Sequence, residues 1–132
     1  MSQSNVAIAR EYLAALSSGI GPEGLERFYA PDVVQEEFPN RLMPSGATRD
    51  LAALKEGRIR GQALLQSENF DVQNIVASVD QVAIEVIWTA VVKATAGPFL
   101  PGQTLRARFA VLLEFHNWRI VLQHNYDCFD AW

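Results

Sequence analysis

The hydrophobic pattern of this chain changes its period part of the way along, and that change constrains the fold more than any other feature. Earlier segments show helical spacing, whereas later segments alternate apolar and polar side chains as strands do. The expected helices span 4–21, 21–30 and 48–66. The expected strands span 33–39, 70–78, 82–95, 104–115 and 118–129. This order predicts an α+β fold in which three N-terminal helices pack on a curved, mainly antiparallel sheet of four to six strands.

Two glycines interrupt the third helical segment. Gly57 and Gly61 lie in its interior, where glycine costs about 1 kcal/mol relative to alanine. We therefore expect a break or a bend at this point. Thr48 can cap the start of this helix, and the carboxylate of Asp50 suits its first turn.

Length and charge limit the class of protein. The 132 residues fit one domain, 1–132, and the net charge of −4 argues against nucleic-acid binding, which needs clustered Lys and Arg. No apolar run approaches the roughly 18 residues of a membrane span, and the N-terminus lacks the pattern of a signal peptide. We therefore expect a cytoplasmic protein. Cys128 is the only cysteine, so an intrachain disulfide is excluded, and we expect it to be a small buried filler.

One face of the expected sheet is more apolar than water alone would favour. Ile87, Val91 and Leu112 alternate with charged residues on the face that the helices leave open. Scattered exposed aliphatic residues are normal on protein surfaces. Over a whole sheet face, however, this composition predicts a homodimer that forms through the open face.

Four segments give the chain a family resemblance: "EYLAALSSG", "LERFYAPDVV", "FPNRLMPSGATRDLAAL" and "RIVLQHNYD". Together they resemble SnoaL-like proteins, named for a polyketide cyclase, within the NTF2-like superfamily. The resemblance covers nearly the whole chain. It implies a cone of three helices against a strongly bent sheet, with an apolar pocket between them and with no metal or organic cofactor. Because this fold hosts several kinds of enzyme and also non-enzymes, function has to be argued from the site.

Ketosteroid isomerases share this fold, and part of their catalytic pattern matches. Tyr12 lies seven residues before Gly19, as does their oxyanion-binding tyrosine. Glu37 lies eight residues after Tyr29, where their base lies, with Glu in place of Asp. Their second oxyanion donor, an aspartic acid, has no counterpart here. The resemblance thus implies a polar pair inside the cone without implying steroid isomerisation.

The end of the last strand offers two competing interpretations. SnoaL-type cyclases carry an aspartate near this point, which corresponds to Asp127, and an apolar pocket would raise its pKa into the range of a general base. Strict alternation from Ile120 and Leu122 instead turns His124 and Tyr126 inward. A β-bulge would reverse that assignment. Both interpretations stay open at this point.

The remaining candidates are a carboxylate pair and a set of aromatic side chains. Alternation lets only one of Glu36 and Glu37 face inward. No metal site is expected, because His124, Glu37 and Asp127 lack the spacing of a ligand pair. The side chains expected to contact a ligand are Trp88, Tyr126, Phe109 and Phe38.

These observations favour a cofactor-independent acid–base enzyme, of cyclase or isomerase type, acting on a small and largely apolar carbonyl compound. Asp127 or Glu37 would be the base, and Tyr12 or His124 would polarise the carbonyl oxygen. The first alternative is a binding module that holds an apolar ligand without chemistry. The second is a dimeric scaffold whose core is closed.

Overall fold

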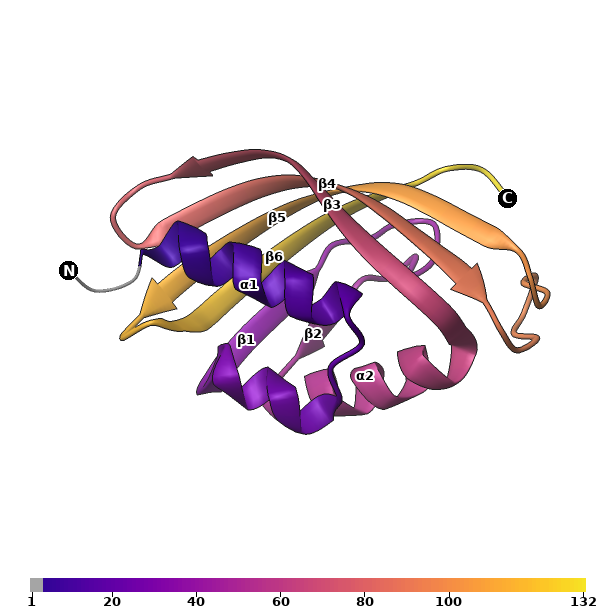
Figure 1. Cartoon of the computed structure of the whole chain (residues 1–132), viewed down its shortest axis with the longest axis horizontal. Helices are drawn as coiled ribbons and strands as arrows, with labels where there is room; N and C mark the ends of the chain where they lie inside the picture. The colour runs from indigo at the N-terminus through magenta and orange to yellow at the C-terminus, as the bar shows by residue number, and fades with distance from the viewer. Residues whose placement is uncertain (1–3) are drawn as a thin grey trace.

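The computed structural model describes residues 4–132, and in it a six-stranded sheet curves over the helices (Figure 1). The helical elements are α1 (Asn5–Ser17), the 3-10 helix η1 (Pro22–Arg27) and α2 (Leu51–Leu64). The strands are β1 (Tyr29–Glu37), β2 (Ala47–Arg49), β3 (Leu65–Ala77), β4 (Gln81–Val92), β5 (Thr104–His116) and β6 (Arg119–Phe129). The expected α+β layout with three helices is therefore confirmed.

Local sequence explains where the helices begin. The side chain of Ser4 accepts a hydrogen bond from the backbone N–H of Ala7 and so caps α1. Asp50 does the same for α2 through the N–H of Ala53. The expectation that Thr48 caps α2 is wrong, because this residue lies in β2, a short strand paired with β1 that the sequence pattern did not reveal.

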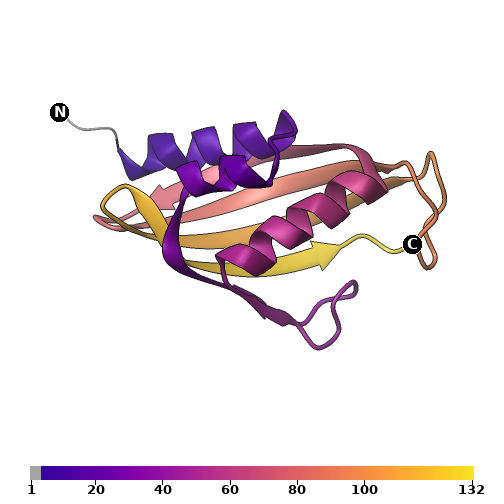
Figure 2. The ribbon, with the colours of Figure 1, turned by 90° about the horizontal axis from the view of Figure 1, so that it is seen from below.

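The strand order β2-β1-β6-β5-β4-β3 joins the two ends of the chain in one sheet. Only β1 and β6 pair in parallel, and the other neighbours are antiparallel. The helices lie on the concave side of this sheet, whereas the loop after β1 projects away from it (Figure 2). β1 and β6 are neighbours in this sheet, and their inward side chains face the same space under the helices.

The core has two adjoining parts. Residues of α1 and η1 pack against the inward side chains of β4 and β5, with Phe28, Ile84 and Leu113 among the most buried. A second group surrounds Trp88 and Phe99 near the other end of β4. The alternation predicted for β4 and β5 is confirmed, because the even-numbered residues of β4 are buried, as are the odd-numbered residues of β5 from Leu105 to Phe115 except the partly buried Phe109.

Helix α2 is continuous through Gly57 and Gly61, so the expected break is wrong. Both glycines line the cavity under the sheet. A Cβ atom on Gly61 would meet no atom within 4 Å. Open space therefore lies beside Gly61, and the backbone keeps its helical course through both glycines.

A β-bulge in β6 exchanges the faces of that strand. Ile120 pairs with Phe115, but Leu122 pairs with Glu114, so β6 contains one residue more than β5 across this interval. After the bulge the odd-numbered residues turn inward, beginning with the buried Gln123. Cys128 lies on the outer face and is exposed, so its expected role as a buried filler is wrong.

Candidate functional site

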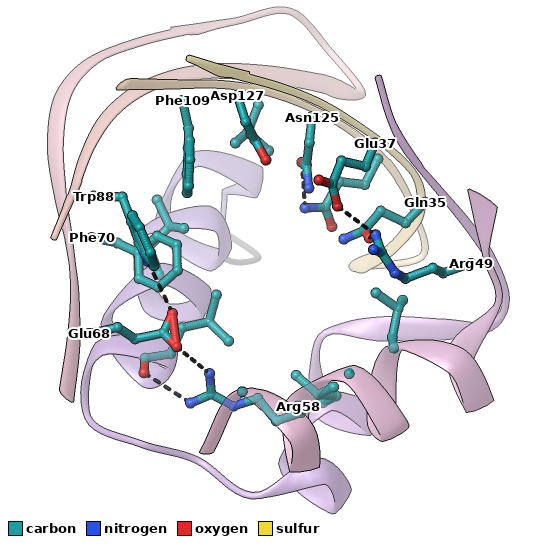
Figure 3. Close-up of a pocket in the computed structure, with 18 of the residues that line it drawn as sticks. Gln35, Glu37, Arg49, Arg58, Glu68, Phe70, Trp88, Phe109, Asn125 and Asp127 are labelled. Atoms are coloured by element: carbon teal, nitrogen blue, oxygen red, sulfur yellow. Dashed lines mark hydrogen bonds and ion pairs between the residues drawn. The ribbon is translucent and has the colours of Figure 1, made fainter. Parts of the chain in front are cut away.

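A cavity of about 540 Å³ lies between the concave face of the sheet and the helices. One wall is aromatic: Trp88 stacks on Phe109 with ring centroids 5.4 Å apart, and Phe129 meets both rings edge-on. Phe70 lies beside them (Figure 3). Trp88 and Phe109, two of the side chains expected to contact a ligand, line this cavity, which also contains charged side chains. The third interpretation, a scaffold without a cavity, does not fit residues 4–132, because side chains leave this space between the sheet and the helices unfilled.

Asp127 extends from β6 toward this cavity beside Phe109, with which it pairs across the strands (Figure 3). Among residues 4–132, its buried atom Oδ1 has no hydrogen-bond partner. Burial raises the pKa of Asp127 to about 7, and the nearby Glu37 carboxylate adds to this rise while Arg49 opposes it. A carboxyl group with this pKa exchanges protons near neutral pH, as a general acid or base must.

Glu37 also lines the cavity, but both of its oxygens are engaged. Oε1 accepts a hydrogen bond from Arg49 at 2.8 Å, and Oε2 accepts one from Asn40 at 2.8 Å. Nη1 of Arg49 also donates to Gln35 at 3.0 Å. Glu37 is therefore the inward member of the Glu36–Glu37 pair, and it is held as an ion-pair partner.

A second polar group lies on the far side of the cavity from Asp127 (Figure 3). Glu68 accepts hydrogen bonds from Trp88 Nε1 and from Arg58, each at 3.3 Å. Arg58 also donates to the backbone oxygens of Leu16 and Ile20 at the end of α1. Arg58 and Glu68 therefore serve as structural links, because their hydrogen bonds join α2 to the end of α1 and to β3.

Tyr12 reaches the cavity from α1, but its hydroxyl is hydrogen-bonded to the hydroxyl of Tyr29. Tyr29 in turn donates to Gln123 Oε1 at 2.6 Å. Burial raises the pKa of both tyrosines, most strongly that of Tyr29. Tyr12 therefore belongs to a buried polar chain, and its proton is committed to Tyr29.

Three predicted site residues lie on the outer face of the sheet. His124 and Tyr126 follow the bulge of β6 and so point away from the cavity. Phe38 stacks on Tyr126 with ring centroids 4.7 Å apart and meets His124 edge-on at 5.3 Å. The assignment of these three residues to the pocket is corrected. Strict alternation omitted the bulge that turns His124 and Tyr126 outward, whereas Phe38 follows the inward-facing Glu37 and so faces the opposite side.

Several cavity residues were not identified as candidates from the sequence. Gln35 shares the inward parity of Glu37 on β1, and Asn125 shares that of Asp127 on β6, so alternation with the bulge included would have found both. Arg49 lies on β2, the short strand that the sequence pattern did not reveal, and Glu68 lies on β3 outside any recognisable sequence motif. Gln35, Arg49 and Asn125 become neighbours only through the pairing of β1 with β2 and β6, and Glu68 lies across the cavity from them.

In residues 4–132 no group of three or more His, Cys, Asp or Glu side chains is placed to hold a metal ion. Within the same range, no helix has the length and apolarity needed to cross a membrane.

In residues 4–132 the fold and the cavity define a small α+β protein whose curved sheet and helices enclose a space that Asp127 enters with an unpartnered carboxyl oxygen. The SnoaL-like domain family matches residues 9–123, so this chain belongs to that family. No curated protein matches the chain in sequence.

Solved structures of similar shape support the fold. IdmH from Streptomyces antibioticus, a proposed polyketide cyclase, superimposes with a TM-score of 0.79 at 22% identity over 95% of this chain and 92% of that one. AclR from Streptomyces galilaeus, a proposed hydroxylase, gives 0.78 at 19% identity over 94% and 78%. A protein from Catenulispora acidiphila with a ketosteroid isomerase-like fold, bound to trimethylamine, gives 0.71 at 19% over 90% and 83%. At such identities the likeness establishes the fold.

Proposed function

We propose that this protein is an acid–base catalyst, of cyclase or isomerase type, that acts on a small, largely apolar carbonyl compound bound in the cavity. Asp127 supports this proposal most directly. It presents a carboxyl oxygen without a hydrogen-bond partner in the described chain, beside an aromatic wall that suits a flat apolar molecule.

The chemistry begins with a proton on the carbon next to a carbonyl group. The Asp127 carboxylate takes that proton, the C–H bond breaks, and its electron pair moves onto the carbonyl oxygen. An isomerase returns the proton to another carbon. In a cyclase, the new nucleophilic carbon attacks a second carbonyl of the same molecule, and the resulting alkoxide takes the proton back from Asp127. Atoms and electrons balance in both cases without an external reductant or oxidant.

Glu37 has a different role in this proposal. Arg49 and Asn40 each donate to one of its two oxygens, so the carboxylate is already engaged in an ion pair and a hydrogen bond. Its negative charge raises the proton affinity of Asp127. Glu37 therefore tunes the base and fixes the polar end of the cavity.

The test is deuterium exchange from D₂O into the acidic C–H positions of 1-indanone and 2-tetralone, followed by NMR. The exchange rate should rise with pH around the pKa of Asp127, about 7. Asp127→Asn should lower it by about 100-fold or more, and Glu37→Gln should lower it by much less. Equal rates for the natural protein and Asp127→Asn would contradict the role of Asp127.

The second candidate is a binding module without chemistry. It is favoured by the internal pairing of most polar groups around the cavity, since Arg49 bonds Glu37 and Arg58 bonds Glu68. Tight binding of the same ketones, with no exchange above the rate of buffer, would support this second candidate and reject catalysis.

A further inference from the structure

A chain of hydrogen bonds runs from the core beneath α1 to the wall of the cavity. It joins Tyr12 to Tyr29, Tyr29 to Gln123, and Gln123 to Asn125. Tyr12, Tyr29 and Gln123 are buried, at 4%, 2% and 3% exposure. Asn125, the last member, lines the cavity (Figure 3). Burial makes each of these bonds costly to break, because the freed groups would have no water to replace them.

The donors in this chain all point the same way. Tyr29 has one hydroxyl proton, which it donates to Gln123 Oε1. Tyr12 must therefore be the donor toward Tyr29. Gln123 then donates through Nε2 to Asn125 Oδ1 at 2.9 Å. In this order the oxygen of the Asn125 amide accepts a hydrogen bond from Gln123. This bond fixes which end of the Asn125 amide is the donor.

The donor end of Asn125 is left for a ligand. Within residues 4–132, Asn125 Nδ2 has no hydrogen-bond partner, although the other amide atom is bonded. Asn125 and Asp127 are two residues apart on the same face of β6, about 7 Å along the strand. A carbonyl compound can therefore place its carbon-bound proton near Asp127 and its oxygen near the amide.

We propose that Asn125 donates a hydrogen bond to the substrate oxygen on which negative charge develops, and that Gln123 and Tyr29 are positioning residues that orient its amide. This assignment rests on the proposed proton abstraction by Asp127. No proton leaves Asn125: the proton moves from substrate carbon to Asp127, the electron pair moves to the oxygen, and the N–H stabilises that oxygen. It fills the role first expected of Tyr12 and His124.

The test uses 4-nitrophenolate as a stable mimic of the charged oxygen and nitrobenzene as its neutral counterpart. All variants carry Asp127→Asn, which represents the protonated base and removes its repulsion of the anion. The reference Asp127→Asn protein should prefer 4-nitrophenolate over nitrobenzene. Adding Asn125→Ala should weaken 4-nitrophenolate binding about 10-fold or more and leave nitrobenzene binding unchanged. The binding of each compound is followed by its absorbance and by calorimetry.

A second variant tests the positioning role. In Gln123→Leu the donor to Asn125 Oδ1 is removed without adding a charge, so the amide is no longer held with its N–H toward the ligand. The binding of 4-nitrophenolate should weaken as it does in Asn125→Ala, by a smaller factor, again with nitrobenzene unaffected. His124→Ala, on the outer face of the same strand, is the matched control and should change neither constant.

Two results would overturn the assignment: no preference for 4-nitrophenolate in the reference protein, or equal losses for both compounds when Asn125 is replaced. Both results are independent of turnover. If deuterium exchange fails to depend on Asp127 while the charge-selective loss is found, the catalytic function is wrong and the donor site stands. In the exchange assay, Asn125→Ala alone should lower kcat more than it changes KM.

Discussion

At the scale of the residue, the burial of Asp127 lowers the stability of the fold and also prepares its carboxyl group for acid–base chemistry. A buried carboxyl oxygen without a partner in the described chain loses its hydration and gains little in return. The group responds by holding a proton to a pH far above that of a free aspartic acid. The same burial that makes the carboxylate costly makes it a strong base at neutral pH.

This proton affinity predicts how stability changes with pH. The pKa of Asp127 is about 7 in the folded chain and near 4 when unfolded. The folded state therefore binds the proton more tightly. The resulting stabilisation is complete below pH ~4, falls as pH rises, and is lost above pH ~7, a total of about 4 kcal/mol at most.

Urea unfolding at a series of pH values from 4.5 to 8 would measure this effect. Asp127→Asn should remove most of the fall in the free energy of unfolding between these limits. Asp32→Asn, at an exposed position of β1, is the matched control and should preserve it. If the natural protein and Asp127→Asn show the same slope, the buried position of this carboxyl group is wrong.

At the scale of the element, β6 shows where sequence reasoning succeeds and where it ends. Alternation identified the strand, and in β4 and β5 it identified the inner face as well. In β6 one additional residue near Val121 exchanges the faces, so His124 lies outside and Asp127 inside. A bulge depends on pairing with another strand, and that pairing is not written in the local pattern. The family resemblance, which pointed to Asp127, proved the better guide there.

The same limit applies to the polar end of the cavity. Glu37 could be proposed from its spacing, but its partner Arg49 belongs to a three-residue strand too short to give a periodic signal. Tyr12 was predicted at its position on α1, whereas its bond to Tyr29 comes from packing between α1 and β1. Sequence thus predicted every element except β2 and several lining residues, and tertiary contacts decided their chemical roles.

Helix α2 yields a prediction about the open space beside Gly61. Because a Cβ atom on Gly61 meets nothing within 4 Å, Gly61→Ala should stabilise the protein by about 0.5–1 kcal/mol. The added methyl group enters the cavity, so binding of ligands that fill it, such as 2-tetralone, should weaken. Ala63→Gly, exposed on the same helix, should destabilise the protein and leave binding unchanged. Urea unfolding and ligand titration would check both, and a less stable Gly61→Ala would contradict this account.

At the scale of the whole molecule, the outer face of the sheet remains the proposed surface of a homodimer. Ile87, Val91 and Leu112 lie on that face, with Phe38 and Tyr126 stacked at its β1–β6 side. Leu112→Glu would bury a charge in such an interface and should convert a dimer to a monomer in sedimentation experiments. Val79→Glu, in a turn and 95% exposed, is the control. A natural protein that sediments as a monomer would reject this proposal.

The position of Trp132 has a practical consequence. Its ring packs against Phe129, which lines the cavity, and against Phe99, while Arg41 lies over its face with Cζ 4.6 Å from the ring centroid. The helix α1 begins at the opposite end of the sheet (Figure 1). Displacing the Trp132 ring would therefore remove a contact of Phe129 at the aromatic end of the ligand space. Binding curves recorded with and without a tag beside Trp132 would show whether that end keeps its shape.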